Sequence, residues 1–576
     1  MSARRYAWAA LLLVPVIAAP FVHSQYLAVV LATIAIDCIA ALGLAITLEK
    51  AGQPSLAQAT FMAIGAYTTG LLELGAHWNM IPAVIAGVVV AGAAAYVIGA
   101  ILLGLEGLYF ALGTLSLVTA VVAILANAPW FGGAVGLDSL QRLQLGGMTT
   151  ESSVMLVAWL LLLVGLVVGQ VVDHGILGRG MRMLRESGKV TRSVGMDPAA
   201  IKRVAFAMSG AYAGLAGGLL TMLFGIVNPQ LFSLATSIAI VAMVVVGGEA
   251  LWGTVVGAVI MVGFGEITRY ELQFAPVSMI GGINLILNGA ILVVIMRVWP
   301  GGVSAISTLR RRGRVRVSDA AIAPLPLVGM GHAATETPSD ERFALRATGI
   351  GHRFGGVTAL TDVALTVRSG EVLAVIGPNG AGKTTLLSIL GGFHELQRGM
   401  VELGDRSVGR LPAHERARLG IAATFQHMEV VQRMSVEENV LAAGRRRDVV
   451  RSAIEAVGLA EHPHDPVSTL SFGQQRMVEL ARAIARPSLP RVLLMDEPAS
   501  GLSARERTLL GDVIKYFARS GTAVILVEHD VGFVARLADR ILVLDHGVAI
   551  AEGPPEPILR APNVVDAYIG KAMASR

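Results

Sequence analysis

Apolar segments long enough to cross a membrane recur through the first 300 residues, and they limit the fold of this chain more than any other feature. A bilayer core of about 30 Å requires roughly 20 apolar residues in a helix. Each segment must satisfy its own backbone hydrogen bonds in lipid, so a helix is expected for each. We predict about ten spans. They lie near residues 6–22, 26–48, 59–74, 81–103, 108–128, 154–172, 204–227, 232–248, 251–267 and 279–299.

The charge distribution divides the chain into two parts. Residues 1–300 contain 13 Lys/Arg and 12 Asp/Glu, whereas the remaining 276 residues contain 33 and 29. Overall, 54% of the residues are hydrophobic and only 15% are charged, which disfavours a wholly soluble protein and excludes a disordered one. Cys38 is the single cysteine, so an intrachain disulfide is excluded.

Basic residues cluster at three edges of the predicted spans. The clusters are Arg4–Arg5, the loop 179–203 and the run 310–316. Ten spans place all three on one side, which the positive-inside rule makes cytoplasmic. We therefore expect both termini in the cytoplasm of a bacterial inner-membrane protein, with lipid headgroups rather than nucleic acid as the anionic neighbour. A cleaved signal peptide would remove the first span and spoil this parity.

Helical continuity breaks at Gly52–Ser55 and again at Gly225–Pro229, five spans apart. An odd offset inverts orientation, so the breaks are typical of an inverted repeat around a substrate path, although two ordinary loops would also explain them. Asp37 lies in the middle of a span, where an acid is a functional candidate by default. The candidate residues of this path are Asp37, Gln53, Ser55 and Gln58.

The second part of the chain contains a phosphate-binding motif. Residues 371–376 (EVLAVI) read as a buried strand, and the motif G-x-x-x-x-G-K-T follows at 377–384 before a helix. Backbone N–H groups and the helix N-terminus favour phosphate there. We expect Lys383 to reach the β- and γ-phosphates of ATP and Thr384 to hold Mg²⁺. The phosphate-binding residues are Gly377, Asn379, Gly380, Gly382, Lys383, Thr384 and Thr385.

Two acids end a second apolar strand, VLLMDE at 492–497. Asp496 can bind Mg²⁺, directly or through water. Glu497 lies one residue further, where a carboxylate can polarise the attacking water.

Three further motifs complete a family pattern. Gln426 follows the stretch 421–425, the sequence LSFGQ occupies 470–474, and His529 ends the apolar strand VILVEHD. In this order, residues 341–576 resemble the ATP-binding domain of ABC transporters. The resemblance implies that Gln426 and His529 join Glu497 in catalysis and that Gln426 also contacts the metal.

The resemblance also implies a site shared between two such domains. Phe354 would stack on adenine, or it is simply a packed aromatic residue. The signature residues would bind the γ-phosphate held by a partner domain; they are Ser471, Gly473 and Gln474. Phe472 stands where the family often has glycine, and Ser503 stands where many members have aspartate.

Both parts resemble one subfamily, the bacterial branched-chain amino acid importers. The ATPase segments that carry this resemblance are 353–356, 424–427, 470–476 and 567–570, and the permease segments are 51–58, 65–67, 107–111 and 247–253. The loop 179–204 resembles the cytoplasmic loop that carries the coupling helix, with Arg185, Glu186 and Gly195 as its marker residues; the alternative is a plain solvated loop.

We therefore expect a polytopic α-helical membrane domain (1–305), a basic flexible linker (306–341) and an α/β P-loop ABC ATP-binding domain (342–576). The predicted function is ATP-driven import of branched-chain or related hydrophobic amino acids, with ATP and Mg²⁺ as cofactors. The expected partners are a second permease, a second ATPase and an external solute-binding protein. The alternatives are an importer of amides or urea, an exporter and an ATP-gated channel.

Overall fold

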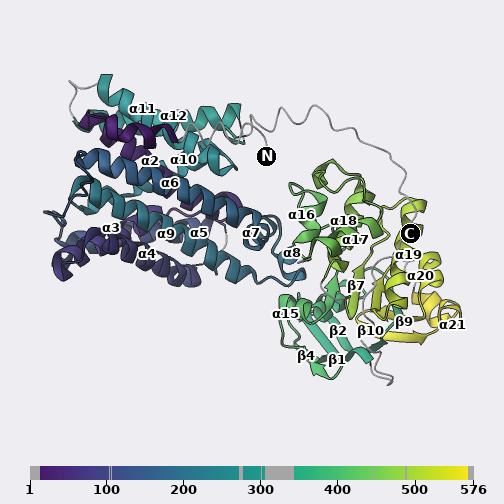
Figure 1. Cartoon of the computed structure of the whole chain (residues 1–576). Helices are drawn as coiled ribbons and strands as arrows, with labels where there is room; N and C mark the ends of the chain where they lie inside the picture. The colour runs from purple at the N-terminus through teal and green to yellow at the C-terminus, as the bar shows by residue number, and fades with distance from the viewer. Residues whose placement is uncertain are drawn as a thin grey trace. The chain divides into compact units, whose positions relative to one another are not determined.

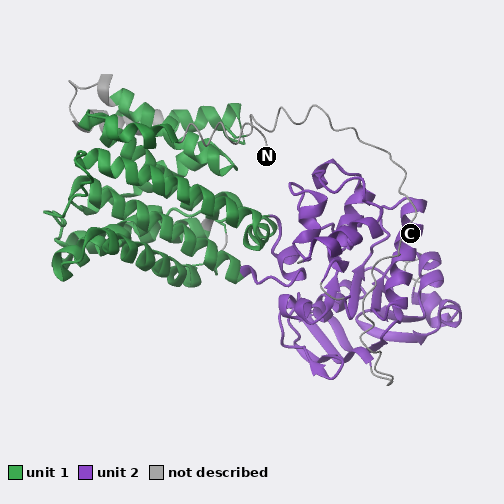
Figure 2. Cartoon of the chain, in the orientation of Figure 1, with its two compact units in different colours: residues 1–185, 199–314 green, residues 186–198, 315–576 purple. Residues whose placement is uncertain are grey.

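The computed structural model describes residues 13–102, 104–105, 107–271, 277–299, 301–304, 343–444, 446–486 and 489–567. Two compact units divide the chain, and Figure 2 shows them in different colours. The first contains residues 1–185 and 199–314, and the second contains residues 186–198 and 315–576. The predicted linker 306–341, the N-terminal and 310–316 arginine clusters, the start of the first predicted span and residues 568–570 lie outside the described residues.

Helices form the first unit (Figure 1). They are α2 (Gln25–Ala45), α3 (Gln58–Ala76), α4 (Met80–Leu102), α5 (Leu108–Asn127), α6 (Thr150–His174), α7 (Ile176–Glu186), α9 (Pro198–Phe224), α10 (Leu234–Gly247), α11 (Leu251–Glu271) and α12 (Val277–Val298). Every predicted span from residue 26 onward overlaps one of these helices. Within the described residues, six helices are long and apolar enough to cross a membrane, and Leu234–Gly247 and Gly289–Val298 are shorter apolar helices. The prediction of ten spans exceeds these six and stays a prediction.

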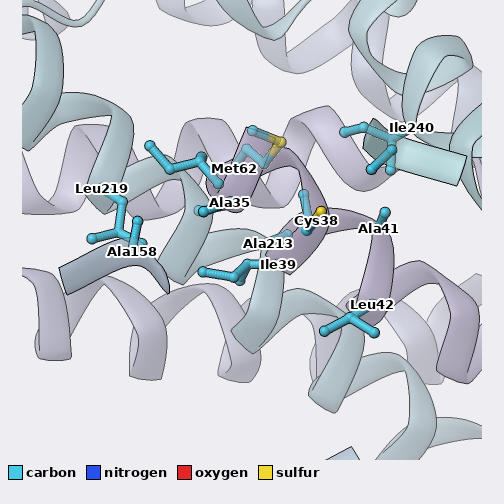
Figure 3. Close-up of a cluster of buried hydrophobic side chains, with 14 of the residues drawn as sticks. Ala35, Cys38, Ile39, Ala41, Leu42, Met62, Ala158, Ala213, Leu219 and Ile240 are labelled. Atoms are coloured by element: carbon cyan, nitrogen blue, oxygen red, sulfur yellow. The ribbon is translucent and has the colours of Figure 1, made fainter. Parts of the chain in front are cut away.

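Small residues let these helices approach closely. Figure 3 shows Ala35 and Cys38 of α2 among apolar side chains from neighbouring helices, including Met62 of α3 and Ala213 of α9. At the crossing of α3 and α9, a Cβ on Gly65 would lie 2.3 Å from the carbonyl oxygen of Gly214. Close backbone contact of this kind supplies van der Waals energy where lipid removes the hydrophobic driving force.

Two sheets form the frame of the second unit. An antiparallel sheet has the order β2-β1-β4-β5, and a six-stranded sheet has the order β10-β9-β3-β8-β7-β6. The strands are β1 (Phe343–Phe354), β2 (Val357–Arg368), β3 (Val372–Ile376), β4 (Arg398–Leu403), β5 (Arg406–Ser407), β6 (Ile421–Ala423), β7 (Val492–Asp496), β8 (Ala523–Val527), β9 (Arg540–Asp545) and β10 (Val548–Gly553). In the larger sheet every pair is parallel except β10 with β9.

The helices of the second unit are α8 (Gly188–Ser193), α14 (Lys383–Gly391), α15 (Ala413–Arg418), α16 (Val436–Leu441), α17 (Arg447–Ala456), α18 (Phe472–Ile484), α19 (Ala504–Arg519), α20 (Val531–Leu537) and α21 (Pro555–Leu559). The strands β3, β7 and β8 are fully buried, as their continuous apolar sequences require, and helices such as α14, α18 and α19 pack against the parallel strands. The carboxyl ends of parallel strands meet at one sheet edge, so the loops after β3, β6, β7 and β8 gather there.

Candidate functional site

The phosphate-binding loop joins β3 to α14 at this edge. Gly377 has a φ of 151°, and a Cβ there would lie 2.1 Å from the carbonyl oxygen of Leu544, so only glycine fits. Lys383 is 6% exposed, and its Nζ donates to the carbonyl oxygens of Gly377 at 2.8 Å and Pro378 at 3.0 Å. The ammonium group therefore lies over its own loop, beside the positive end of α14, in an arrangement that favours an anion.

Asp496 ends β7 and is 5% exposed. Burial raises the pKa of its carboxyl group, and a hydrogen bond from Thr384 opposes that shift. Its Oδ1 is buried without a hydrogen-bond partner. A hydroxyl group beside a carboxylate oxygen with spare capacity is the oxygen set that Mg²⁺ prefers. Thr384 and Asp496 therefore fit a magnesium ion.

Glu497 and His529 meet although 32 positions separate them in the sequence. They follow β7 and β8, which are paired with Asp496 opposite Val527. His529 Nε2 lies 2.7 Å from Glu497 Oε1. Glu497 also has a left-handed φ of 47°, a conformation that costs a non-glycine residue about 1–3 kcal/mol and clusters at functional sites. A carboxylate fixed in this way can polarise a water molecule.

Gln426 lies in the exposed loop after β6, and its main chain rather than its side chain is anchored. Arg476 donates to the carbonyl oxygens of Phe425 at 2.6 Å and Gln426 at 3.0 Å. Among the described residues, no hydrogen bond joins the Gln426 side chain to Asp496 or Glu497. The structure therefore connects this loop to the signature helix α18.

Ser471 is the N-cap of α18, in a capping box with Gln474. Inside the same helix, Arg476 and Glu479 form a buried ion pair of 2.8 Å, with side chains 3% and 0% exposed. Glu479 accepts a hydrogen bond from the Phe425 N–H at 3.0 Å. Burial raises the pKa of Glu479, and Arg476 opposes that shift. Sequence reasoning missed this pair, although charges three residues apart among apolar neighbours were a usable signal.

The signature also contacts the loop at 500–503. A Cβ on Gly501 would lie 2.7 Å from the ring of Phe472, and a Cβ on Gly473 would lie 1.8 Å from Glu506 Oε1. Ser503 caps α19 in a capping box with Glu506. The two unusual residues, Phe472 and Ser503, therefore both belong to contacts between the signature and this loop.

Glu528 is a second residue that sequence reasoning missed. It is 4% exposed, and its carboxylate accepts hydrogen bonds from the N–H groups of Ala499 at 2.7 Å and His529 at 3.2 Å. Burial raises the pKa of this carboxyl group. Glu528 thus ties the start of the 500–503 loop to His529. An acid directly before the histidine of VILVEHD was the available signal.

Phe354 ends β1 and is 46% exposed, as a residue that stacks on a ligand requires. Its ring centroid lies 4.5 Å from that of His352 and 5.4 Å from that of His394. Burial lowers the pKa of His394, with smaller contributions from His352 and Lys189. Phe354 therefore belongs to an aromatic group at the end of β1.

The four candidate path residues in the first unit have different surroundings. Gln58 is buried between helices: it donates to the carbonyl oxygen of Ala40 at 2.7 Å and accepts from the Ser209 hydroxyl at 3.0 Å. Ser55 is 3% exposed and accepts from the Ala57 N–H. Asp37 is half-buried, and no described residue gives its carboxylate a hydrogen bond or an ion pair. Gln53 is also half-buried.

Gln53 lines a hollow of about 200 Å³ at the break between α2 and α3. The other lining residues are Gly52, Pro54, Leu105, Gly107, Phe110 and Lys202. The π-helical turn Ile46–Lys50 leads into this break, and such turns recur at functional sites. An ammonium group, an amide and apolar surface can together hold a small amphipathic molecule.

The loop 179–204 is divided between the units. Arg185 belongs to the first, where it donates to the carbonyl oxygen of Glu49 and pairs with the carboxylates of Glu49 at 3.7 Å and Glu249 at 3.3 Å. Glu186 begins the segment of the second unit, and the carbonyl oxygen of Gly195 accepts a hydrogen bond from Arg418 at 2.8 Å. The boundary between Arg185 and Glu186 therefore separates the predicted coupling residues.

Two family models match the chain. Residues 26–296 match the model described as branched-chain amino acid transport system / permease component, and residues 360–500 match the model described as ABC transporter.

Individual relatives match part of the chain. The high-affinity branched-chain amino acid transport ATP-binding protein LivG of Salmonella typhimurium is 35% identical over 252 residues, which cover 40% of this chain and 98% of LivG. The protein of the same description from Pseudomonas aeruginosa, BraF, is 36% identical over 252 residues, with the same coverage of 40% and 98%. A solved ATP-binding cassette of an ABC transporter in its ADP conformation is 27% identical, with a TM-score of 0.37 and coverage of 40% of this chain and 100% of that one.

Proposed function

The chain belongs to the branched-chain amino acid family of ABC transporters, with its permease and ATP-binding parts in one polypeptide, and we propose that it imports branched-chain or related hydrophobic amino acids across the bacterial inner membrane. It is a multi-pass membrane protein whose cytoplasmic ATPase domain is coupled to solute transport. One observation carries the substrate class: a branched-chain permease match at 26–296 and an ATPase of the LivG and BraF kind occur in the same chain. Urea, amides, export and channel gating are not favoured.

The proposed hydrolysis uses the edge of the six-stranded sheet. Lys383 and the N–H groups of the phosphate-binding loop hold the phosphates of ATP, and Phe354 stacks on the base. Glu497 orients the attacking water and His529 holds Glu497, as their 2.7 Å contact supports. Gln426 approaches the same phosphates when its loop moves with α18.

Thr384 and Asp496 would hold Mg²⁺, with Gln426 as a further ligand. The ion would neutralise charge that develops on the phosphate oxygens. The unpartnered Oδ1 of Asp496 supports this assignment.

Assembly is part of the proposal. Ser471, Gly473 and Gln474 bind the γ-phosphate of an ATP held by a second ATPase, so a lone chain forms no complete site. We favour a heteromeric complex with a second permease and a second ATPase over a homodimer. An external solute-binding protein delivers the amino acid.

Transport is proposed to follow the break between α2 and α3. Its residues are Asp37, Gln53, Ser55 and Gln58, with Lys202 and Phe110 beside Gln53. Residues Arg185, Glu186 and Gly195 of the loop 179–204 couple this path to ATP. Both termini lie in the cytoplasm in this proposal, because ten spans place them on the same side as this basic loop, which the positive-inside rule makes cytoplasmic.

The test is uptake in proteoliposomes. The full chain is reconstituted with a second permease, a second ATPase and the external binding protein, and accumulation of radiolabelled leucine, isoleucine, valine and urea is measured with ATP inside. We expect ATP-dependent accumulation of the branched-chain amino acids and none with the Glu497→Gln chain. Accumulation of urea without leucine would overturn the substrate assignment.

A further inference from the structure

Arg486 is a partly buried cation that is held by main-chain carbonyl groups. It lies two residues after the end of α18, and its Nη1 donates to the carbonyl oxygens of Ala417 at 2.5 Å and Ile421 at 3.2 Å. Its Nη2 donates to the carbonyl oxygen of Ser193 at 2.7 Å. No described carboxylate pairs with Arg486, and burial lowers its pKa to about 10. One third of its hydrogen bonding therefore comes from the segment 186–198.

Arg418, the last residue of α15, contacts the same segment. Its Nε donates to the carbonyl oxygen of Gly195 at 2.8 Å. Gly195 has a φ of 81°, and a Cβ there would lie 3.2 Å from Arg418 Cγ. A glycine at this point thus permits both the turn after α8 and the approach of the arginine.

The carbonyl groups that accept these hydrogen bonds lie at the C-terminal end of a helix, where positive charge is stabilising. The last carbonyl groups of a helix have no intrahelical partner and carry partial negative charge, and Ser193 and Gly195 are at the end of α8. The Ser193 hydroxyl donates within the segment, to the carbonyl oxygen of Val190. Both arginines therefore donate hydrogen bonds to main-chain carbonyl oxygens of the segment 186–198 and not to its side chains.

The other contacts of Arg486 join two regions of the ATP-binding unit. Arg486 follows the C-cap residue of α18, the helix that begins at the signature, whereas Ile421 is the first residue of β6, the strand that leads to Gln426. A single guanidinium group thus links the signature helix, the strand before Gln426 and the end of α8. We propose that Arg418 and Arg486 are positioning residues that hold the end of α8 and transmit movement of α18 to residues 186–198. The role in transmitting movement to the transport path rests on the proposed function.

The experiment uses the full chain with its partners. The variants are Arg486→Gln, Arg486→Lys and Arg418→Gln, and the matched control is Arg451→Gln, whose side chain is 83% exposed on α17. Limited trypsin digestion measures cleavage after Lys189 and Arg192, two exposed residues of the segment. ATP affinity and the number of amino acids imported per ATP hydrolysed are measured on the same samples.

Arg486→Gln should raise the rate of cleavage at these two sites on the order of tenfold, because a hydrogen bond from a charged group is lost. It should leave ATP affinity within about twofold and lower the import per ATP hydrolysed. Arg486→Lys should partly restore both the wild-type resistance to cleavage and the import per ATP hydrolysed. Arg451→Gln should behave as wild type.

Wild-type cleavage in both Arg486→Gln and Arg418→Gln would overturn the docking role. Faster cleavage with an unchanged import per ATP would overturn the transmission role. If Arg486→Gln does not bind ATP, Arg418→Gln decides, since its side chain leaves fewer carbonyl groups unpaired. A wild-type chain that imports no amino acid would overturn the proposed function, whereas faster cleavage in the variants would still support docking.

Discussion

At the scale of single residues, Glu497 combines two constraints. Its left-handed backbone turns the chain immediately after β7, and His529 fixes its carboxylate from the next strand. The preceding residue, Asp496, keeps a buried oxygen without a partner. Two adjacent acids therefore have different surroundings, which suits different roles in water activation and metal binding.

Glu497→Gln should retain ATP binding and lose turnover. The amide preserves the shape of the side chain but cannot accept a proton from water, so we expect the hydrolysis rate to fall by about 10²–10⁴-fold. Lys383→Ala is the contrasting variant, because it should weaken ATP binding itself. ATP affinity and steady-state hydrolysis of the assembled complex separate the two effects. Wild-type turnover in Glu497→Gln would reject the assignment.

The histidine beside Phe354 predicts a pH dependence. The pKa of His394 is lowered in the folded chain from its ordinary value of 6.5, chiefly by burial. The unfolded chain therefore takes up this proton first, and the stabilisation is lost as pH falls from 6.5 through the folded pKa. We expect the melting temperature to drop over this window in wild type and less steeply in His394→Gln. His464→Gln, at a histidine 82% exposed, should keep the wild-type slope.

At the scale of elements, a cluster of ion pairs joins four helix ends in the first unit. Arg185 at the end of α7 pairs with Glu49 after α2 and with Glu249 before α11. Lys50 pairs with Asp173 of α6 at 3.1 Å. The Arg185–Glu249 pair is the most exposed of these, and a surface pair contributes at most about 1 kcal/mol, so this pair orients helix ends more than it stabilises the fold.

Arg185→Glu should uncouple hydrolysis from import. It places three carboxylates together beside Gly52, where a Cβ would already lie 3.0 Å from Arg185 Cγ. ATP hydrolysis should continue, because the nucleotide site lies in the other unit. The exchange variant Arg185→Glu with Glu249→Arg should restore part of the import per ATP hydrolysed. Unchanged import in Arg185→Glu would contradict a role for this pair.

At the scale of the whole molecule, orientation can be tested with cysteines. Cys38 is buried, so the wild-type chain should react little with a membrane-impermeant maleimide. Ser139 and Arg192 are exposed residues on opposite sides of the predicted topology. In intact spheroplasts, Ser139→Cys should label and Arg192→Cys should label only after lysis. Labelling of both before lysis would contradict the predicted topology.

Assembly is the second prediction at this scale. The phosphate-binding loop and the signature are expected to serve different ATP molecules, so the purified chain alone should hydrolyse ATP slowly and import nothing. Adding the second permease, the second ATPase and the binding protein should restore both activities. Uptake and hydrolysis are measured before and after addition. Full coupled transport by the chain alone would reject the heteromer in favour of a homodimer.

The sequence by itself determined the features that depend on local composition and short spacing. Each apolar segment predicted from residue 26 onward coincides with a helix, because a helix satisfies its own backbone hydrogen bonds whatever its neighbours. The phosphate-binding loop was equally readable, since the strand, the glycines and Lys383 are contiguous. The family followed from motifs in a fixed order.

Only the tertiary structure decided which distant residues meet. The contact of Glu497 with His529 depends on β7 and β8 being neighbours in a parallel sheet, which no local pattern encodes. The spacing of Arg476 and Glu479 permits a pair, but only the fold shows that both side chains are buried and that the pair has a structural role. The loop 179–204 reads as one basic segment, yet Arg185 contacts helix ends of the first unit while Gly195 contacts Arg418 of the second. Contacts between residues far apart in the sequence depend on how the helices and strands pack together. That packing follows from all of the interactions in the folded chain and not from any short segment.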